Sequence, residues 1–428
     1  MAKSNTESTP ESSSESSSES TTPPLWQFIP LAQFEKARPQ EPTQEAVRHG
    51  LQTLWKRLPG RSAPQEPETA EAARSLKSAP TTLMDMAAPE PEWGHKGGDG
   101  LDEALSAWLG EKDAGSRVIV CGPGSGVDEM VQAWGDDHGI QLVTLPRPEE
   151  ILASGEWLAQ FGGADRPRVI LAGLERCYLR HPDGLDLLRG LLDRIWQGEI
   201  TGLFTCDSWA WTYLNRVLQI ESILPGPQTL APLDGDALAR WFRALAQRHP
   251  PRILTFRQTN DGRPILVAKA DGDPEAAEDE LTSNQGFLNY LAARSRGNPG
   301  VARAIWRESL QVDSEEAVES KAQEEAAADR GYTMWVNPWP RVNLPGMPAN
   351  SGQDEAFVLH ALLLHNGLAA SVLPELVPLS REQVIRVVQR LRTARLVAGV
   401  HDRWQVTPLG YPAVRSFLAQ EGFLIDVL

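Results

Sequence analysis

The sequence predicts an α/β fold: a parallel, three-layer sheet, then a helical region, then a small C-terminal domain. Two observations support this prediction. Between residues 117 and 219, short β-branched and apolar runs alternate with amphipathic stretches of helical length, a pattern typical of βαβ units around a parallel sheet. After residue 234 longer helical stretches predominate, so a helical layer should follow the sheet.

The N-terminal region, residues 1–95, is rich in Ser, Glu, Pro and Thr. Such a composition buries too little apolar surface to offset the entropy lost on ordering, so a largely disordered tail is predicted. Two apolar islands interrupt it, Leu25 to Leu31 and an amphipathic stretch from Val47 to Leu58. Each is interpreted as a strap on this protein's own surface, as a docking motif for a partner, or as a segment without a role, in that order of preference.

The chain of 428 residues is long enough for two or three domains. The N-terminus lacks the apolar core of a signal peptide, and no run of 18 uncharged apolar residues occurs. We therefore expect a cytoplasmic protein with no membrane span. The three cysteines, Cys121, Cys177 and Cys206, fit neither a disulfide framework nor a zinc pattern and are interpreted as buried thiols.

The net charge of −16 is unevenly distributed along the chain. Residues 271–280 hold six acids and no base, and residues 313–329 hold seven acids and one Lys, so these two segments together carry −12. The remainder is close to neutral. Net charge therefore does not exclude a nucleic-acid partner.

The sheet domain is expected over residues 96–232. In chain order its predicted elements are a strand at Val118–Cys121, a helix at Asp128–Asp137, a strand at Gln141–Leu145, a helix around Pro148–Phe161, a strand at Arg168–Ala172, a helix at Gly184–Trp196, a strand at Gly202–Cys206 and a helix at Trp209–Gln219.

A helical lid is expected over residues 233–312. Its predicted helices are Asp236–Arg248, Gln285–Arg296 and Val301–Leu310, with an inserted hairpin of Ile253–Arg257 and Pro264–Ala268. Asn260-Asp261-Gly262 joins the two hairpin strands and is a strong turn signal. Residues 313–353 are predicted to be a linker, acidic at first and then proline-rich.

A glycine-rich loop follows the first predicted strand and precedes a helix, which is the position of a nucleotide-binding P-loop. The candidate residues are Gly122, Pro123, Gly124, Ser125, Gly126, Val127 and Asp128. In G-x-x-x-x-G-K-[ST], backbone N–H groups surround phosphate, Lys reaches the β/γ-phosphates and Ser/Thr binds Mg²⁺. Here Val127 replaces Lys, Asp128 replaces Ser/Thr, and the loop is one residue short. We interpret the segment as a degenerate nucleotide site, and a plain glycine-rich turn is the alternative.

Residues 101–310 together resemble the AAA+/STAND class of P-loop ATPases, in which a P-loop NTPase-like sheet domain precedes a helical lid. This resemblance implies ATP or ADP as the ligand. It also implies a Walker B strand ending in a Mg²⁺-binding Asp, usually followed by a Glu. Ala172 stands in place of that Asp, and Glu175 is the only residue that could be a remnant of the Walker B carboxylates. The preferred alternative is that Glu175 has no such role and is either paired with a nearby Arg or solvated.

Two further positions follow from the resemblance. Asp207 and Ser208 stand at the sensor-1 place after the fourth strand, although capping of the next helix is the favoured interpretation. The turn Arg296-Gly297-Asn298-Pro299 resembles the G-N-P turn of STAND lids, in which Pro299 would lie against adenine. Gly300 replaces the sensor-2 Arg of AAA+ proteins. Because three catalytic groups are missing, the resemblance implies a pseudo-ATPase.

Residues 354–428 resemble a winged-helix domain of the MarR-like kind. The predicted elements are helices Ala356–His365, Ala370–Leu376 and Arg381–Leu396, a hairpin of Leu396–Val400 and Arg403–Thr407, and a last helix. Arg381, Arg386 and Arg390 on the third helix are the candidate nucleic-acid contacts. The favoured alternative is a module for protein contacts, because the predicted wing is not basic.

No constellation of nucleophile, base and acid can be assembled from the sequence, and no metal site either, since His360 and His365 lack the i, i+4 spacing of a helical metal pair. We therefore predict a regulatory or scaffolding pseudo-ATPase that binds an unknown protein partner through the N-terminal tail or the winged helix. Weak nucleotide binding without significant hydrolysis is expected. A DNA-binding transcription regulator is the first alternative, and an active ATPase with an atypical P-loop is the second.

Overall fold

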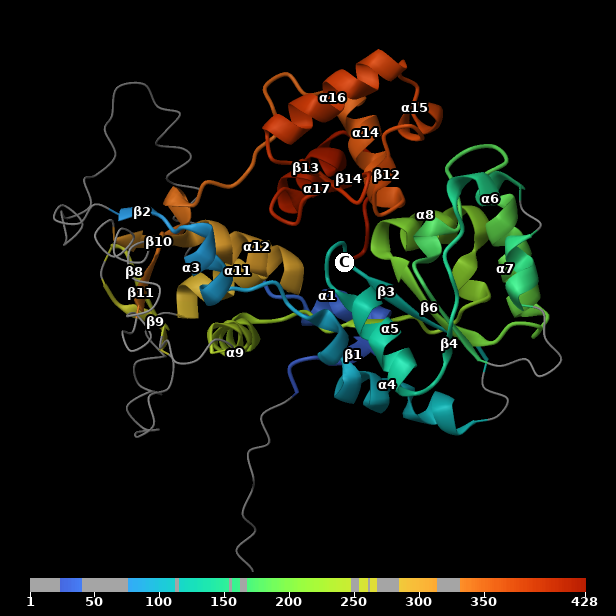
Figure 1. Ribbon diagram of the computed structural model, residues 1–428, viewed down its shortest axis with the longest axis horizontal. Coiled ribbons are helices and arrows are strands. Elements are labelled where there is room, and N and C mark those ends of the chain that lie inside the picture. Colours follow the sequence, from blue (N-terminus) through green and yellow to red (C-terminus); the bar gives the residue numbers. More distant parts are fainter. Residues whose placement is uncertain are drawn as a thin grey trace, which may run out of the picture.

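The computed structural model describes residues 24–40, 76–111, 115–153, 156–161, 168–247, 254–260, 262–267, 285–313 and 332–428. They form a central sheet domain, a lid with a sheet of its own, and a C-terminal domain (Figure 1). The second apolar island, Val47 to Leu58, lies outside the described residues. Along the described ranges, no helix has the length and apolar character needed to cross a membrane.

The central sheet has six strands in the order β1-β7-β3-β6-β5-β4. They are β1 (Phe28–Pro30), β3 (Arg117–Cys121), β4 (Gln141–Leu142), β5 (Val169–Ala172), β6 (Gly202–Asp207) and β7 (Gln228–Leu230). The pairs among the last five strands are parallel, whereas β1 pairs with β7 in antiparallel fashion. The predicted α/β fold with a parallel, P-loop NTPase-like sheet is therefore confirmed.

Helices cover both faces of this sheet (Figure 1). One face carries α4 (Gly98–Gly110) and α5 (Val127–Asp137), and the other carries α6 (Pro148–Ala153), α7 (Asp186–Trp196) and α8 (Ser208–Leu218). This division follows from right-handed crossovers, because the chain reverses its direction across the sheet after β4. The helix predicted around Pro148–Phe161 was wrong as a single element, since the structure divides it into α6 and a 3₁₀ turn at Trp157–Phe161.

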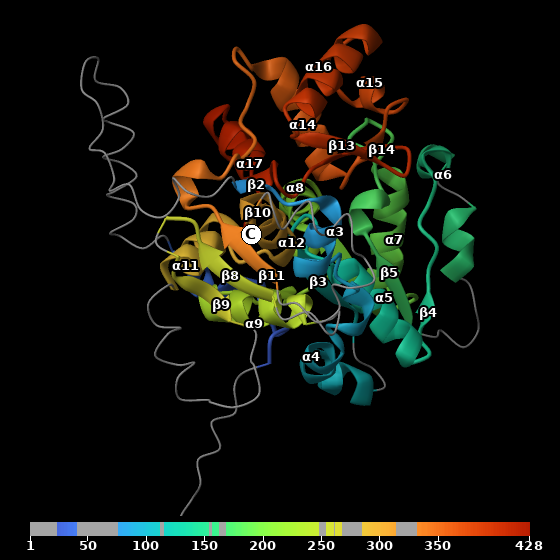
Figure 2. The same cartoon turned by 60° about the vertical axis from the view of Figure 1, so that its left-hand side comes forward.

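The lid combines helices with a second sheet (Figure 2). Its helices are α9 (Gly235–Ala246), α11 (Gln285–Arg294) and α12 (Pro299–Ser309), joined by α3 (Thr81–Ala87). Its strands, in sheet order, are β2 (Leu76–Ser78), β10 (Leu310–Asp313), β11 (Tyr332–Val336), β8 (Leu254–Gln258) and β9 (Pro264–Val267). Trp306 packs between the two layers, with its ring 5.0 Å from that of Phe242 and 5.2 Å from that of Phe256.

The linker predicted for residues 313–353 was wrong in part. Residues 332–336 form strand β11, which pairs with β10 on one side and in parallel with β8 on the other. The sequence did not indicate this strand, because acidic residues precede it and a proline-rich stretch follows it. Hydrogen bonding to a neighbouring strand along each of its edges stabilises it, and the alternation of five residues cannot predict such pairing.

The N-terminal boundary also needs correction. The island Leu25 to Leu31 contains β1, and Trp26 is buried against Trp93 and Trp241, with ring centroids 5.9 and 5.6 Å away. Farther along, β2 pairs with β10, and Arg307 donates hydrogen bonds to Ala88 O and Asp85. The folded part therefore begins well before Leu101, and the first island is a strap on this protein's own sheet.

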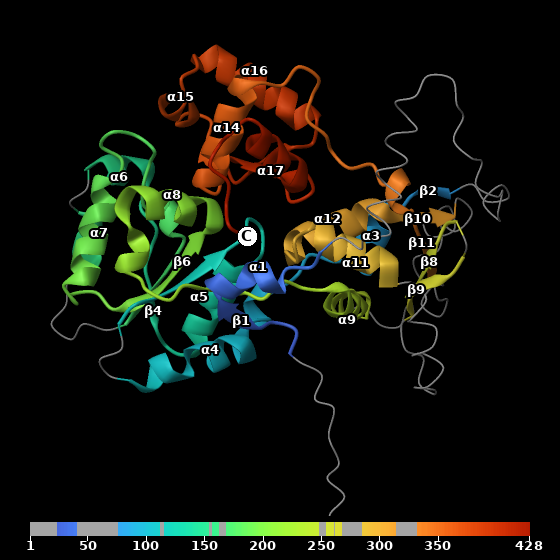
Figure 3. The same cartoon turned by 180° about the vertical axis from the view of Figure 1, so that it is seen from behind.

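The C-terminal domain contains α14 (Gln353–Leu364), β12 (Leu368–Ala369), α15 (Leu373–Leu376), α16 (Arg381–Thr393), β13 (Val397–Val400), β14 (Arg403–Val406) and α17 (Tyr411–Gln420). Its strands form an antiparallel sheet in the order β12-β14-β13. A capping box begins α16, as predicted, because Ser380 and Gln383 bond to each other's backbone N–H groups. Figure 3 shows this domain over the helix α8 side of the central sheet, where Tyr178 OH donates to Leu364 O at 2.8 Å.

Candidate functional site

The candidate site lies at the carboxyl ends of β3, β5 and β6, the edge where parallel α/β sheets bind ligands. The loop Gly122 to Gly126 connects β3 to α5 at this edge. Gly124 and Gly126 have φ angles of +67° and +79°, and this left-handed conformation strongly favours glycine. The loop therefore turns tightly into the helix, as its sequence predicted.

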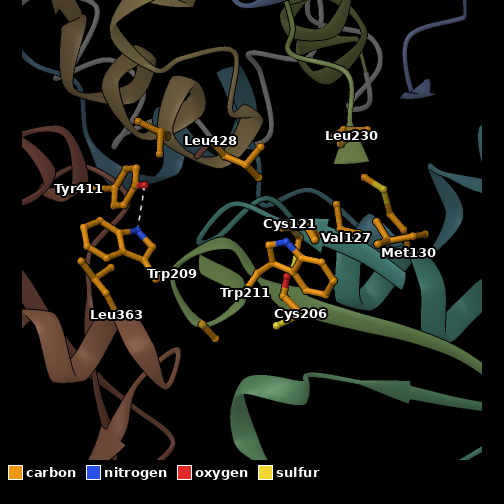
Figure 4. Close-up of a cluster of buried hydrophobic side chains, with 14 of the residues drawn as sticks. Cys121, Val127, Met130, Cys206, Trp209, Trp211, Leu230, Leu363, Tyr411 and Leu428 are labelled. Carbon is orange, nitrogen blue, oxygen red and sulfur yellow. Dashed lines mark hydrogen bonds between the residues drawn. The ribbon is translucent and has the colours of Figure 1, made fainter. Parts of the chain in front are cut away.

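Val127 and Asp128 begin α5, where a P-loop would have Lys and Ser/Thr. Val127 is 1% exposed and lies beside Met130 in the core (Figure 4). The Asp128 carboxylate accepts a hydrogen bond from the Thr205 hydroxyl on β6, and Cys121 Sγ lies 3.7 Å from its Oδ1. Both side chains therefore contact the protein interior.

The lid closes over the loop at two points. Asn298 Nδ2 donates to Pro123 O at 3.1 Å. A Cβ placed on Gly300 would lie only 1.9 Å from Gly124 O. The backbone of the lid therefore touches the backbone of the loop, and only glycine at position 300 allows that approach.

Three other segments complete the cover over the loop. On the N-terminal side, a Cβ on Gly126 would lie 2.2 Å from an atom of the Trp93 ring. From the C-terminal domain, Pro408 and Leu428 reach the loop: a Cβ on Gly124 would lie 3.4 Å from Pro408 Cγ, and one on Gly122 would lie 4.0 Å from Leu428 Cδ1.

A small pocket remains between the loop, the lid and the C-terminal domain. Its lining includes Phe34, Gly122, Ser125, Arg296, Pro299 and Leu428. Pro299 thus lies in the pocket where the resemblance places adenine. The cavity volume is ≈ 30 Å³, whereas sites for drug-sized ligands have about 300–1,000 Å³. In this arrangement the protein itself fills the space that a nucleotide would need.

Glu175 follows β5 and is completely buried. Its Oε2 accepts a hydrogen bond from Asp207 N at 3.0 Å, while Oε1 has no hydrogen-bond partner among the described residues. Burial, and secondarily the charge of Asp128, raises the pKa of Glu175 to about 7. In the described structure it forms no ion pair with Arg176 or Arg180, so the predicted Arg pairing or solvation was wrong.

Asp207 and Ser208 stand at the junction of β6 and α8. Asp207 Oδ1 accepts a hydrogen bond from Trp209 N at 2.9 Å and thus caps α8. Burial, followed by the nearby Glu175 charge, raises the pKa of Asp207 well above its usual range. Ser208 Oγ instead donates to Asp426 at 2.8 Å. Although carboxylates gather here, no group of three or more His, Cys, Asp or Glu in the described part of the chain is arranged to hold a metal ion.

The thiols of Cys121 and Cys206 lie on adjacent strands, because β3 pairs with β6. Cys121 Sγ is 3.5 Å from Cys206 O, and both thiols are free and buried. Burial raises the pKa of each thiol well above its usual range. The interpretation of these cysteines as buried thiols is confirmed.

The arginines of α16 lie on a different domain from the loop. Arg390 is paired with the buried Glu355 at 2.8 Å and also donates to Ala349 O at 2.6 Å. Arg381 and Arg386 are exposed. The structure therefore gathers the predicted loop, Walker B, sensor and lid residues at one sheet edge, and leaves the predicted nucleic-acid contacts elsewhere.

Sequence reasoning missed several residues of this site. Trp93 lies in a Gly- and Pro-rich stretch that carries no motif. Asp426 and Leu428 belong to the run FLIDVL, in which one acid among apolar residues could have indicated a buried anchor. Arg296 was noted only for its place in the predicted lid turn, and its contact with this run was not foreseen.

Comparison with known proteins identifies no matching family model and no matching curated protein. Among solved structures, the ORC2 protein of Aeropyrum pernix is 14% identical, covers 78% of this chain and 98% of its own, and has a TM-score of 0.34. The RuvB Holliday junction branch migration motor of Thermotoga maritima is 13% identical, with 77% and 94% covered and a TM-score of 0.30. The Walker-type ATPase of Pyrococcus abyssi is 12% identical, with 77% and 99% covered and a TM-score of 0.29. The fold assignment rests on the strand order and the loop position described above.

Proposed function

We propose that this protein is a regulatory or scaffolding pseudo-ATPase of the AAA+/STAND type that binds a protein partner. The observation that carries the proposal is the set of residues at three catalytic positions: Val127, Ala172 and Gly300 replace the P-loop Lys, the Walker B Asp and the sensor-2 Arg. Val127 is buried. At Gly300 the close approach of Gly124 O leaves no room for an Arg side chain.

Electrostatics supports at most weak nucleotide binding. Asp128 places a carboxylate at the position of the Mg²⁺-binding hydroxyl. Ionised carboxylates repel phosphate, and they do so most strongly where little water screens them. A nucleotide would therefore have to displace protein groups and also meet negative charge.

We expect purified protein to show no ATP turnover near about 1 s⁻¹, which is an ordinary enzyme rate. Val127→Lys combined with Asp128→Thr should stay inactive, because Ala172 still replaces the Mg²⁺-binding carboxylate. Phosphate release measured across the purification is the test. Turnover that increases with protein concentration and is abolished by Glu175→Gln would favour an active ATPase with an atypical P-loop.

Binding of a protein partner in the cytoplasm is the second half of the proposal. Because β1 and β2 belong to the folded part, deletion of residues 1–95 would damage both sheets. A variant lacking residues 1–23 removes no described element, and is therefore the better probe of the N-terminal region. Affinity purification of the full chain and of this variant from the host would show whether that region recruits the partner.

A DNA-binding transcription regulator is the second candidate. Its support is the exposed, basic face of α16, which carries Arg381, Arg386 and Arg392, within an order of elements that fits a winged helix. Two observations oppose it. Arg390 forms an ion pair with Glu355. Arg403 on β14 donates a hydrogen bond to His365 O within the domain, so neither side chain is free for DNA in this arrangement.

Fluorescence anisotropy of the full chain with fragmented host DNA separates these candidates. We expect only weak, non-specific binding, and no greater loss for Arg386→Ala than for the exposed control Arg189→Ala on α7. Specific complexes typically have dissociation constants of about 10⁻⁸ M or below at physiological salt. Sequence-selective binding of that strength, weakened by salt and by Arg386→Ala alone, would favour the regulator.

A further inference from the structure

The last residues of the sequence, Phe423–Leu428, form what we call the return segment. They leave α17 and run back to the carboxyl edge of the central sheet, where the end labelled C lies beside β3 (Figure 1). Leu428 is buried, and its side chain lies against Gly122 of the loop. Its backbone oxygen accepts a hydrogen bond from Arg296 Nε at 2.8 Å. The segment thus reaches the pocket that would otherwise be the nucleotide site.

Asp426 is the polar anchor of the return segment. It is 3% exposed, and its carboxylate accepts hydrogen bonds of 2.8 Å from Ser208, Tyr411 and Arg415. Ser208 belongs to the central domain, whereas Tyr411 and Arg415 belong to α17. Tyr411 also accepts a hydrogen bond from Trp209 Nε1 at 3.1 Å (Figure 4). Asp426 therefore joins the C-terminal domain to the sheet edge.

Burial alternates over the last three residues of the return segment, as it would in a bound peptide. Asp426 and Leu428 are buried, whereas Val427 between them is 46% exposed. The segment has no regular secondary structure, so its position depends on these side chains and on a few backbone contacts. Alternating pockets that read every second side chain are a common basis of peptide recognition.

The charges around the pocket complement an acidic peptide. Arg296 lies within reach of Glu35, at 3.6 Å, and Arg415 pairs with Asp426 at 2.8 Å. Burial, and next the positive charge of Arg415, lowers the pKa of Arg296. Each of these partly buried cations therefore has a carboxylate partner, and the return segment supplies the partner of Arg415.

We infer that this pocket is a peptide-binding site and that the return segment is its ligand in cis. The ligand class is an extended peptide with Asp followed two residues later by Leu, supplied in trans by the partner. This inference rests on the proposed function, since it names the site at which a pseudo-ATPase of this kind takes its partner. Because the remaining cavity is only ≈ 30 Å³, a partner peptide binds only when the return segment leaves, and the C-terminal domain then loses its Asp426 anchor.

The test uses a fluorescent synthetic peptide, GFLIDVL, which corresponds to residues 422–428. We expect it to bind a variant that lacks residues 423–428 at least tenfold more tightly than it binds the full chain. The same peptide with the change Asp426→Asn should bind that variant at least tenfold more weakly, because it brings no charge to Arg415. A peptide with Val427→Ala is the matched control and should bind as the original does.

Equal binding of the Asp and Asn peptides, or no binding to a deletion variant that unfolds cooperatively, would overturn the inference. If the deletion variant does not fold, full-length Leu428→Ala replaces it, with Val427→Ala as its control. Hydrogen exchange of the amides of Gly122 and of residues 124–126 should then rise at least tenfold for the first variant alone, and equal exchange would overturn the inference. ATP turnover measured on the same variants tests the pseudo-ATPase proposal separately.

Discussion

Gly300→Ala should lower the free energy of unfolding by about 3 kcal/mol, at the upper end of the cost of overpacking. The added methyl group would overlap Gly124 O, which lies 1.9 Å from its position. Neither partner yields easily, because one is loop backbone and the other is the first turn of α12. Urea denaturation followed by circular dichroism measures the loss, and increased protease sensitivity of the loop would accompany it.

Gly98→Ala is the matched control, since Gly98 also lies in the first turn of a helix. A Cβ at this position has nothing within 4 Å, so we expect unchanged stability or a gain of up to about 1 kcal/mol from the better helix former. Equal effects of the two substitutions would show that the contact between lid and loop contributes nothing to stability.

Glu175→Gln should make the protein more stable than the wild type at pH 8, by roughly 3 kcal/mol. The pKa of Glu175 is raised from 4.5 to about 7 in the folded protein, and each unit corresponds to about 1.4 kcal/mol. The folded state therefore binds this proton more tightly than the unfolded state does. Its stabilising contribution is complete below about pH 4.5 and is lost as pH rises through about 7. Glutamine stays neutral and still offers an oxygen to Asp207 N.

The difference in stability between wild type and Glu175→Gln should be measured from pH 5 to pH 8. The stability difference between the two proteins must be used, because two buried histidines change the stability of both proteins with pH in the opposite direction to Glu175. Burial lowers the pKa of His360 to about 4 and that of His365 to about 3, so they destabilise the fold as pH falls below about 6.5. A difference that does not grow with pH, or that exposed Glu103→Gln reproduces, would contradict the prediction.

The central sheet was predictable because its strands are locally encoded. Strands such as β3 and β6 are runs of apolar residues buried on both faces, bounded by turn residues. The short strands β1, β2 and β11 were not predictable, because three to five residues carry no clear periodicity and their stability comes from distant partners. A local pattern cannot report pairing between segments that are far apart in the sequence.

The same distinction applies to the site. Glycine density and position after a strand identified the loop, and the missing Lys was visible directly in the sequence. The groups that cover the loop could not be found in this way. Trp93, Pro408 and Leu428 come from three regions that carry no nucleotide-site motif, and only the tertiary structure brings them to Gly122–Gly126.

The N-terminal strands have a consequence for how the chain folds as it is made. Strand β1 pairs with residues 228–230 and β2 with residues 311–313, so each is synthesised about 200 residues or more before its partner. At a synthesis rate of about 5–20 residues per second, each strand stays without its pairing partner for roughly 10 seconds or more. Such non-local pairing is also intrinsically slow. A fragment that starts at residue 96 would complete neither sheet. It would expose the backbone edges of β7 and β10, which are templates for pairing with another copy of the chain, so such fragments should aggregate where the whole chain does not.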